Sequence, residues 1–169
     1  MAVRPFIRFD DKRLHTAAEP VTDITDEIRA IWADMVDTME AMPGQGVGLA
    51  APQIGVMLRL AVVDASEARG QAIVMANPEV LHASGQMRDH DEASPNLPGV
   101  WATISRPRAV TVRFLNAAGE IEERDFVHLW ATSVQHQIDH LNGKTYVDHL
   151  SMLKRKMLVA KSAKFAKKA

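Results

Sequence analysis

The sequence contains no cysteine, and this absence excludes two kinds of chemistry. Without thiols the chain forms no disulfide and offers no thiolate to bind a metal or to attack a substrate. A long apolar run is also missing. The N-terminus, MAVRPFIRFDDKRL, has no continuous apolar segment like those of secretory signals. The uncharged stretch 41–58 is interrupted by four glycines and two prolines, which favours a loop over a membrane span. We therefore expect a cytoplasmic protein with no membrane contact.

Acidic residues are missing from the end of the chain. Residues 151–169 carry seven lysines and arginines and no acid. Removing these seven from the 20 basic residues leaves 13 against 21 acidic ones, so residues 1–150 have a net charge of −8. The length and the 47% hydrophobic content suit one domain. We expect residues 1–150 to form it, and 151–169 to be a basic helix or tail of the same domain. Such a charge run is more often a solvated helix face than a nucleic-acid contact.

Apolar periodicity predicts three helices. Over 26–42, apolar residues recur at steps of three and four, and Thr25 is placed to cap the helix. A second helix is expected over about 127–141, ended by Asn142-Gly143. A third, basic helix is expected from Ser151.

Strands are expected between these helices. Short apolar runs at 59–65 and 71–78 are bounded by turn residues. The alternation over 109–126, with a turn at 116–119, is typical of a hairpin. Helices mixed with mostly antiparallel strands give the α+β class.

The stretch SVQHQIDHLNG, residues 133–143, contains the most informative spacing. His136 and His140 are four residues apart, so on a helix their imidazoles share a face and can bind one ion. The zinc-binding motif H-E-x-x-H has this spacing, with the Glu as general base. Here that position is Gln137. Two histidines at this spacing alone are more often a coincidence, but the amphipathic helix around them favours metal binding.

Two further stretches are weaker signals. In GQGVGLAAPQIG, residues 44–55, the glycines allow a backbone to approach a ligand, and Gln53 can present an amide N–H to a carbonyl oxygen. A plain connecting turn is the more common explanation. In DEASPNLPGVW, residues 91–101, Pro95 and Pro98 cannot donate to a strand ladder. This second stretch predicts a fixed loop.

Taken in order, the three stretches resemble the motifs of the peptide deformylase family. G-x-G-L-A-A-P-Q is followed roughly forty residues later by E-x-x-x-x-L-P-G, and roughly forty later again by Q-H-x-x-D-H-L-x-G. The combination is highly specific, and the resemblance runs from RPFIRFDD to DHLSMLK. It implies a fold of mostly antiparallel strands around a central helix that carries H-x-x-x-H. It also implies a metal-dependent hydrolase that removes the formyl group from the N-terminal methionine of nascent chains.

Residue by residue, the resemblance implies three losses. The family reads E-G-C-L-S where this chain reads EASPN, residues 92–96. Ser94 replaces the metal-binding Cys, and a protonated hydroxyl is a poor ligand beside thiolate or imidazole. Pro95 replaces a leucine whose backbone N–H meets the formyl oxygen in the family, and proline has no N–H. Gln137 cannot accept a proton as the family's Glu does. Gln53, His136, His140 and the glycine loop remain.

The resemblance also places the pocket for the methionine side chain. The wall of this pocket is mostly apolar in the family. The five matching positions here are Val47, His90, Leu129, Thr132 and Ser133, and three of them are polar. Because a thioether gains most from apolar burial, we expect a relaxed preference for formyl-methionine. The substrate-binding positions implied are Gly46, Val47, Gly48, His90, Leu129, Thr132 and Ser133.

Three functions compete. Losing a general base costs ~10²–10⁴ in rate and losing an oxyanion donor ~10²–10³. The main prediction is therefore an impaired or inactive relative, a pseudoenzyme, that binds the N-terminal peptide of nascent chains. An alternative is a working hydrolase with Asp91 or Glu92 as substitute ligand. A further alternative is a module that binds the ribosome or ribosomal RNA through the basic tail.

The implied cofactor is a divalent metal, iron, zinc or nickel. The donors left for it are His136, His140 and the hydroxyl of Ser94. With no anionic donor among them, the metal is predicted to be held weakly or not at all.

Overall fold

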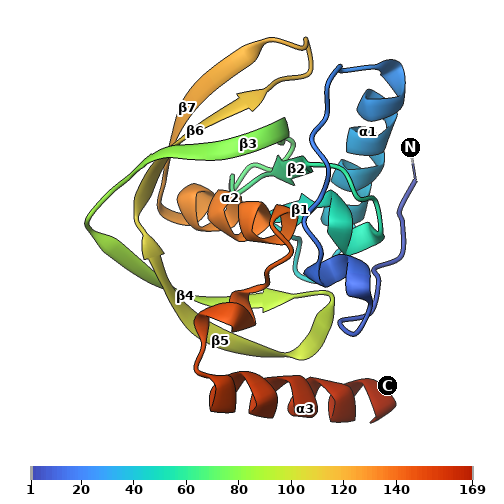
Figure 1. Ribbon diagram of the computed structural model, residues 1–169, viewed down its shortest axis with the longest axis vertical. Helices are drawn as coiled ribbons and strands as arrows, with labels where there is room; N and C mark the ends of the chain where they lie inside the picture. The colour runs from blue at the N-terminus through green and yellow to red at the C-terminus, as the bar shows by residue number, and fades with distance from the viewer. Residues whose placement is uncertain (1, 169) are drawn as a thin grey trace.

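The computed structural model describes residues 2–168, which form antiparallel strands and helices around one central helix. This helix, α2 (His128–Leu141), lies in the middle of the molecule and carries both His136 and His140. Strands curve around one side of it, and α1 (Asp26–Glu40) covers the other (Figure 1). The expected α+β class, with mostly antiparallel strands around a helix that carries H-x-x-x-H, is confirmed.

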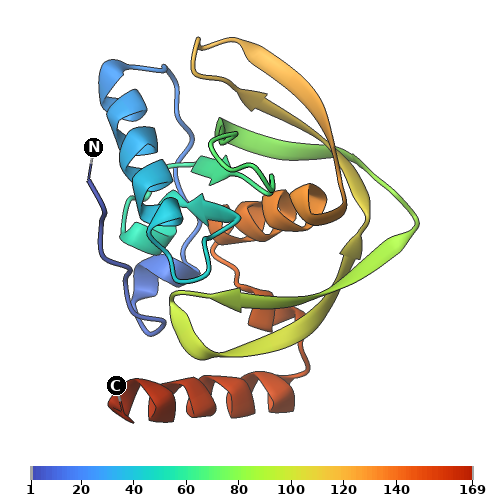
Figure 2. The same cartoon turned by 180° about the vertical axis from the view of Figure 1, so that it is seen from behind.

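The strands form two sheets. The larger has the order β1-β2-β3-β6-β7, and every neighbouring pair is antiparallel. The smaller sheet is the hairpin β4-β5. Seen from behind, the two sheets diverge on either side of α2 (Figure 2). The strand bounds are β1 Gly48–Ala50, β2 Leu60–Val63, β3 Ile73–Ala83, β4 Met87–Ser94, β5 Leu97–Pro107, β6 Ala109–Leu115 and β7 Ile121–Val127.

Helix α1 forms where its pattern predicted it. The Thr25 side chain accepts a hydrogen bond from the Ile28 backbone N–H at 3.2 Å, which caps the first turn. Met35 and Met39 are fully buried in the core between α1 and the strands β1 and β2. The Trp32 indole is also buried there and donates to the Met75 carbonyl at 3.2 Å. Burial of this face attaches α1 to the larger sheet.

The prediction of a fixed loop over 91–101 is wrong. β4 and β5 pair from Met87↔Pro107 to Ser94↔Leu97. Pro95 lies in the turn between the strands, and Pro98 lies in the unpaired stretch where the register shifts. Neither nitrogen is needed in the ladder, so the prolines are compatible with a hairpin.

The other predicted elements are present with changed bounds. The strand expected at 71–78 extends to Ala83, and the hairpin over 109–126 is formed by β6 and β7. The glycine loop contains β1 and a short 3₁₀ helix, Ala51–Ile54.

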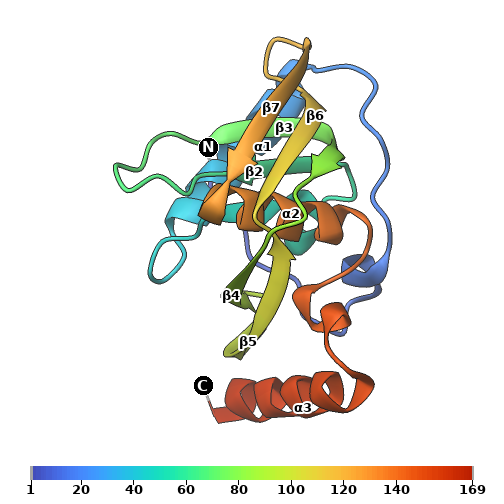
Figure 3. The ribbon, with the colours of Figure 1, turned by 90° about the vertical axis from the view of Figure 1, so that its left-hand side faces the viewer.

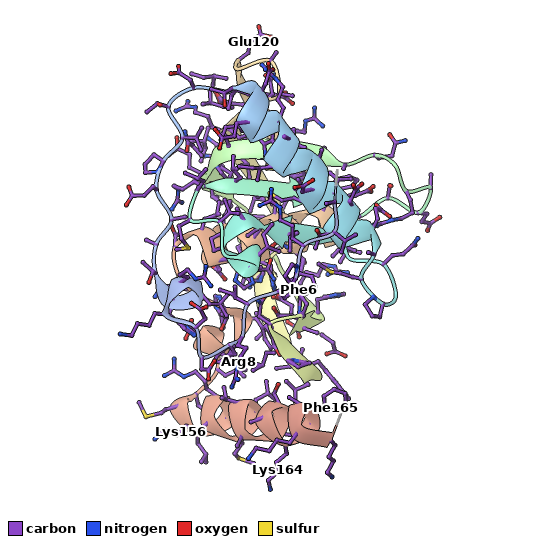
Figure 4. The ribbon with its side chains drawn as sticks, turned by 90° about the vertical axis from the view of Figure 1, so that its right-hand side faces the viewer. Phe6, Arg8, Glu120, Lys156, Lys164 and Phe165 are labelled. Carbon is purple, nitrogen blue, oxygen red and sulfur yellow. The ribbon has the colours of Figure 1, made fainter. Side chains whose placement is uncertain are left out.

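The third predicted helix, α3 (Met152–Lys168), packs against the smaller sheet at the end of the molecule opposite the β6–β7 turn (Figure 3). Ser162 is buried and its hydroxyl donates to the Pro98 carbonyl at 2.7 Å. Figure 4 shows Lys156 and Lys164 on α3, far from Glu120 in the β6–β7 turn. Within residues 2–168, no helix has the length and apolar character needed to cross a bilayer.

Candidate functional site

His136 and His140 face each other on consecutive turns of α2. Their Nε2 atoms are 3.2 Å apart, and both side chains are buried. Two nitrogen ligands of one tetrahedral ion lie about 3.3 Å apart, so the spacing fits an ion shared by the two rings. Burial, and then the charge of His136, lower the pKa of His140 well below its usual value. His140 is therefore neutral, which is the form that binds metals. Its Nδ1 is buried without a hydrogen-bond partner.

Glu92 orients the first of these rings. Its Oε1 lies 2.8 Å from His136 Nδ1, and Arg106 donates from Nε to Oε2 at 2.6 Å and from Nη2 to Oε1 at 2.9 Å. Burial would raise the pKa of Glu92, but the hydrogen bonds from His136 and Arg106 outweigh it and lower the pKa to about 2. An ionised carboxylate at Nδ1 directs Nε2 of the ring toward His140.

Glu92 is therefore unsuited to the substitute-ligand role considered for it. Both of its oxygens are engaged, and it contacts the side of the His136 ring that faces away from His140. Arg106 was missed by the sequence analysis. It is brought to Glu92 by the pairing of β4 with β5, although Arg106 itself lies beyond the stretch 91–101 that was expected to be a loop.

Ser94 and Gln53 bind to each other and to a residue the sequence analysis overlooked, Asn96. Gln53 Nε2 donates to Asn96 Oδ1 at 2.8 Å and to Ser94 Oγ at 3.4 Å. Gln53 Oε1 accepts from the Ala50 backbone N–H at 2.9 Å. Asn96 Nδ2 in turn donates to the Gln53 carbonyl at 3.0 Å. The amide that was expected to meet a substrate carbonyl is thus engaged within the protein.

Only two side chains of this site, His136 and His140, are suitable metal ligands. A catalytic zinc site uses three protein ligands. Nowhere in residues 2–168 are three His, Cys, Asp or Glu side chains placed to hold one ion together. The third position, Ser94, offers a neutral hydroxyl that is already hydrogen-bonded to Asn96 Oδ1 at 3.2 Å. The residues present therefore do not match a three-ligand catalytic centre.

Gln137 lies where α2 approaches β1. Its side chain is buried, and its Oε1 has no hydrogen-bond partner. A Cβ at Gly48 would come within 2.5 Å of Gln137 Nε2 and of Ser133 Oγ, so only glycine fits there. The Ser133 hydroxyl donates to the Val47 carbonyl at 2.8 Å, which holds the glycine loop against α2.

The buried Tyr146 contacts His136 and was also missed. Its ring is stacked 6.1 Å from that of His136, and its hydroxyl is buried without a partner. Burial, with the charge of Glu92, raises the pKa of Tyr146 to about 12. The phenol therefore remains protonated and can only act as a hydrogen-bonding group.

A cleft of about 200 Å³ brings most of the predicted residues together. Ser94 and His140 do not line it and are buried. Among its further lining residues, Met42, Gln45 and Ala93 were not predicted. The predicted residues that do line it are Gly46, Val47, Gly48, Gln53, His90, Pro95, Leu129, Thr132, Ser133, His136 and Gln137.

Comparison with known proteins shows which family the chain resembles over its length. The family model described as Polypeptide deformylase matches residues 3–156. The chain is 43% identical to the peptide deformylase of Afipia carboxidovorans, with 100% of this chain and 99% of that one aligned. It is 41% identical to the peptide deformylase of Cellvibrio japonicus, with 97% and 96% aligned.

Solved structures agree with these relatives. The crystal structure of a peptide deformylase from Legionella pneumophila superposes with a TM-score of 0.91 at 40% identity, covering 98% of this chain and 96% of that one. The peptide deformylase of Ehrlichia chaffeensis in complex with actinonin gives a TM-score of 0.90 at 32% identity, covering 97% and 98%.

Proposed function

Because the chain belongs to the peptide deformylase family, we propose that its cleft binds the formylated N-terminal residue of a nascent peptide and that removal of the formyl group there is slow. The proposal rests on the residues that α2 presents to the cleft. The two imidazoles and their orienting carboxylate are in place, while Gln137 occupies the position of the general base. The site thus keeps the two imidazoles and has, in Gln137, a side chain that cannot take a proton.

The slow rate follows from what each residue offers to the formyl group. Pro95 has no N–H for the formyl oxygen, and the Gln53 amide is held by Asn96. The loss of one oxyanion donor costs ~10²–10³ in rate. Gln137 can hydrogen-bond a water molecule but cannot deprotonate it, which costs ~10²–10⁴. These factors need not multiply, since residues that act as a unit are not additive.

We further propose that a divalent metal binds weakly between His136 and His140. When bound, such an ion supplies Lewis acidity and lowers the pKa of water. With two imidazoles and no anionic ligand, its affinity is expected to fall well below that of a three-ligand site.

A second candidate is a fully active deformylase. It is supported by the names of the relatives, which are peptide deformylases at 41–43% identity over nearly the whole chain. It is also supported by the retained pair His136–His140 and by Glu92. This candidate requires a third ligand and a base from other residues. Asp91 lines the cleft, but its carboxylate accepts a hydrogen bond from the Thr103 hydroxyl at 2.6 Å.

Metal content and turnover, measured together, distinguish the two candidates. We expect the purified protein to bind formyl-Met-Ala-Ser in calorimetry, to lose zinc, nickel or iron(II) on dialysis, and to turn the peptide over at least about a hundredfold below ~10 s⁻¹, the median for enzymes. The variant His140→Ala is the control for metal held at this site. Stoichiometric metal that survives dialysis, with turnover near ~10 s⁻¹, would establish the second candidate.

We also propose that α3 contacts ribosomal RNA. Its six lysines are exposed, whereas Arg155 is paired with Asp148 at 2.7 Å. The affinity for a ribosomal RNA fragment should fall linearly on a log–log plot against salt. The double variant Lys161→Gln/Lys164→Gln should lower that slope by about two. Lys12→Gln/Lys144→Gln, with the two lysines outside α3, is the matched control. Equal slopes for both double variants would contradict the proposal.

A further inference from the structure

One row of side chains on β4 faces the central helix. The burial of this strand alternates, so Arg88, His90, Glu92 and Ser94 are turned inward and the odd-numbered residues outward. Two members of the row bind α2 at the same spacing. Arg88 Nη1 donates to Thr132 Oγ1 at 3.1 Å, and four residues further along both elements Glu92 meets His136.

The two contacts differ in their charge balance. Glu92 is neutralised by Arg106 at 2.6 Å. Arg88 is half-buried, and no carboxylate in residues 2–168 forms an ion pair with it. Its only side-chain hydrogen bond there is to the neutral Thr132 hydroxyl. An unpaired, partly buried cation therefore lies against the wall of the cleft, since Thr132 is a lining residue.

Neighbouring groups do not cancel this charge. Asp89 and Asp91 belong to the outward set of β4, and the Asp91 carboxylate is bound to Thr103. His90 follows Arg88 in the same inward row of β4, and burial, then the charge of Arg88, lower the pKa of its imidazole. The two carboxylates that line the cleft, Asp91 and Glu92, are thus bound to Thr103 and Arg106, and neither forms an ion pair with Arg88.

Resting on the proposed function, we infer that this wall selects an acidic side chain: the preferred ligand is a formyl-peptide whose first residue is glutamate, in place of methionine. A carboxylate at Arg88 would form a charge-assisted hydrogen bond, about twice as strong as a neutral one. The Thr132 hydroxyl accepts from Arg88, which leaves its own proton for a second bond to the ligand. A methionine thioether would instead bury apolar surface against His90, Thr132 and Arg88 and would leave their polar groups unsatisfied.

The inference is tested by binding alone, so it does not depend on turnover. Calorimetry would compare formyl-Glu-Ala-Ser with its neutral isostere formyl-Gln-Ala-Ser and with formyl-Met-Ala-Ser. We expect the Glu peptide to bind about tenfold or more tighter than the Gln peptide. Arg88→Met should remove this preference by weakening the Glu peptide more than the Gln peptide, whereas Arg88→Lys should retain part of it.

Lys144→Met is the matched control. It removes one positive charge from an exposed position beyond the other end of α2, and it should not change the ratio of the Glu to the Gln peptide. Equal binding of all three formyl-peptides would overturn the acidic preference and leave the proposed function standing. Binding of none of them would overturn both. A preference that persists in Arg88→Met would show that another group selects the carboxylate.

Discussion

A chain carrying Ser94→Cys, Pro95→Leu and Gln137→Glu together is expected to hydrolyse a formyl-methionyl tripeptide at least about a hundredfold faster than the unaltered chain, because a general base alone contributes ~10²–10⁴. The scaffold needed for this gain is present. The His136 and His140 Nε2 atoms are 3.2 Å apart, and Glu92 fixes the first ring. Ser94→Cys adds the anionic ligand, which a bound metal stabilises by lowering the thiol pKa.

Each single change is expected to do little, because a base without a bound metal has no activated water to deprotonate. Pro95→Leu returns a backbone donor in the turn between β4 and β5. Gln137→Glu replaces a buried amide whose Oε1 has no partner, so the substitution breaks no hydrogen bond of that atom. Metal content and formyl-peptide turnover should be measured for the three single variants and the triple variant.

A fourth substitution, at Asn96, is expected to increase the activity further. Its Oδ1 accepts from Gln53 Nε2 at 2.8 Å, and this bond withdraws the amide from a substrate oxygen. Adding Asn96→Ser, the residue that the family motif has here, should raise the turnover of the triple variant further. Asn142→Ser, on an exposed residue after α2, is the matched control. If the quadruple variant folds, holds stoichiometric metal and remains inert, the loss of activity lies in the pocket around His90 and Thr132, and the expectation of repair is wrong.

Replacing Arg106 by methionine is expected to lower the free energy of unfolding by ~3–5 kcal/mol, because it leaves the Glu92 carboxylate buried without its strongest partner. Glu92 is 4% exposed and Arg106 is 4% exposed, so solvent cannot compensate. Arg106 also binds Asp139 at 2.9 Å, and Asp139 binds His149 at 2.8 Å. Chemical denaturation monitored by circular dichroism measures the change.

Two variants show whether the loss arises from an uncompensated charge. Arg106→Met/Glu92→Leu removes both ions and should lose far less stability than Arg106→Met alone. Arg113→Met breaks an exposed pair with Glu123 at 3.3 Å and should cost only ~0.2–1 kcal/mol. A loss in Arg106→Met no larger than in Arg113→Met would contradict the prediction.

Local sequence patterns predicted the elements that depend on local interactions. The α1 boundaries follow from a Thr25 cap and a periodic apolar face, and the β6–β7 hairpin follows from alternation and a turn. His136 and His140 could be paired from sequence because the pitch of a helix alone places positions i and i+4 on one face. The proposed loss of a ligand, a donor and a base at positions 94, 95 and 137 rests on the resemblance to the family motif and stays a prediction.

Contacts between residues distant in sequence were decided by the tertiary structure. Arg106 meets Glu92 because strands β4 and β5 pair in one register, and prolines in the turn region hid that pairing from a local pattern. The capture of Gln53 by Asn96, 43 residues away, required the β4–β5 turn to lie against the 3₁₀ helix. Whether Arg88 has an ion-pair partner depends on which face of β4 each nearby carboxylate occupies, and this is a property of the folded strand. Residue types indicated which side chains can bind or donate, whereas packing determined which partners the polar groups have, because long-range partners depend on strand register and helix position.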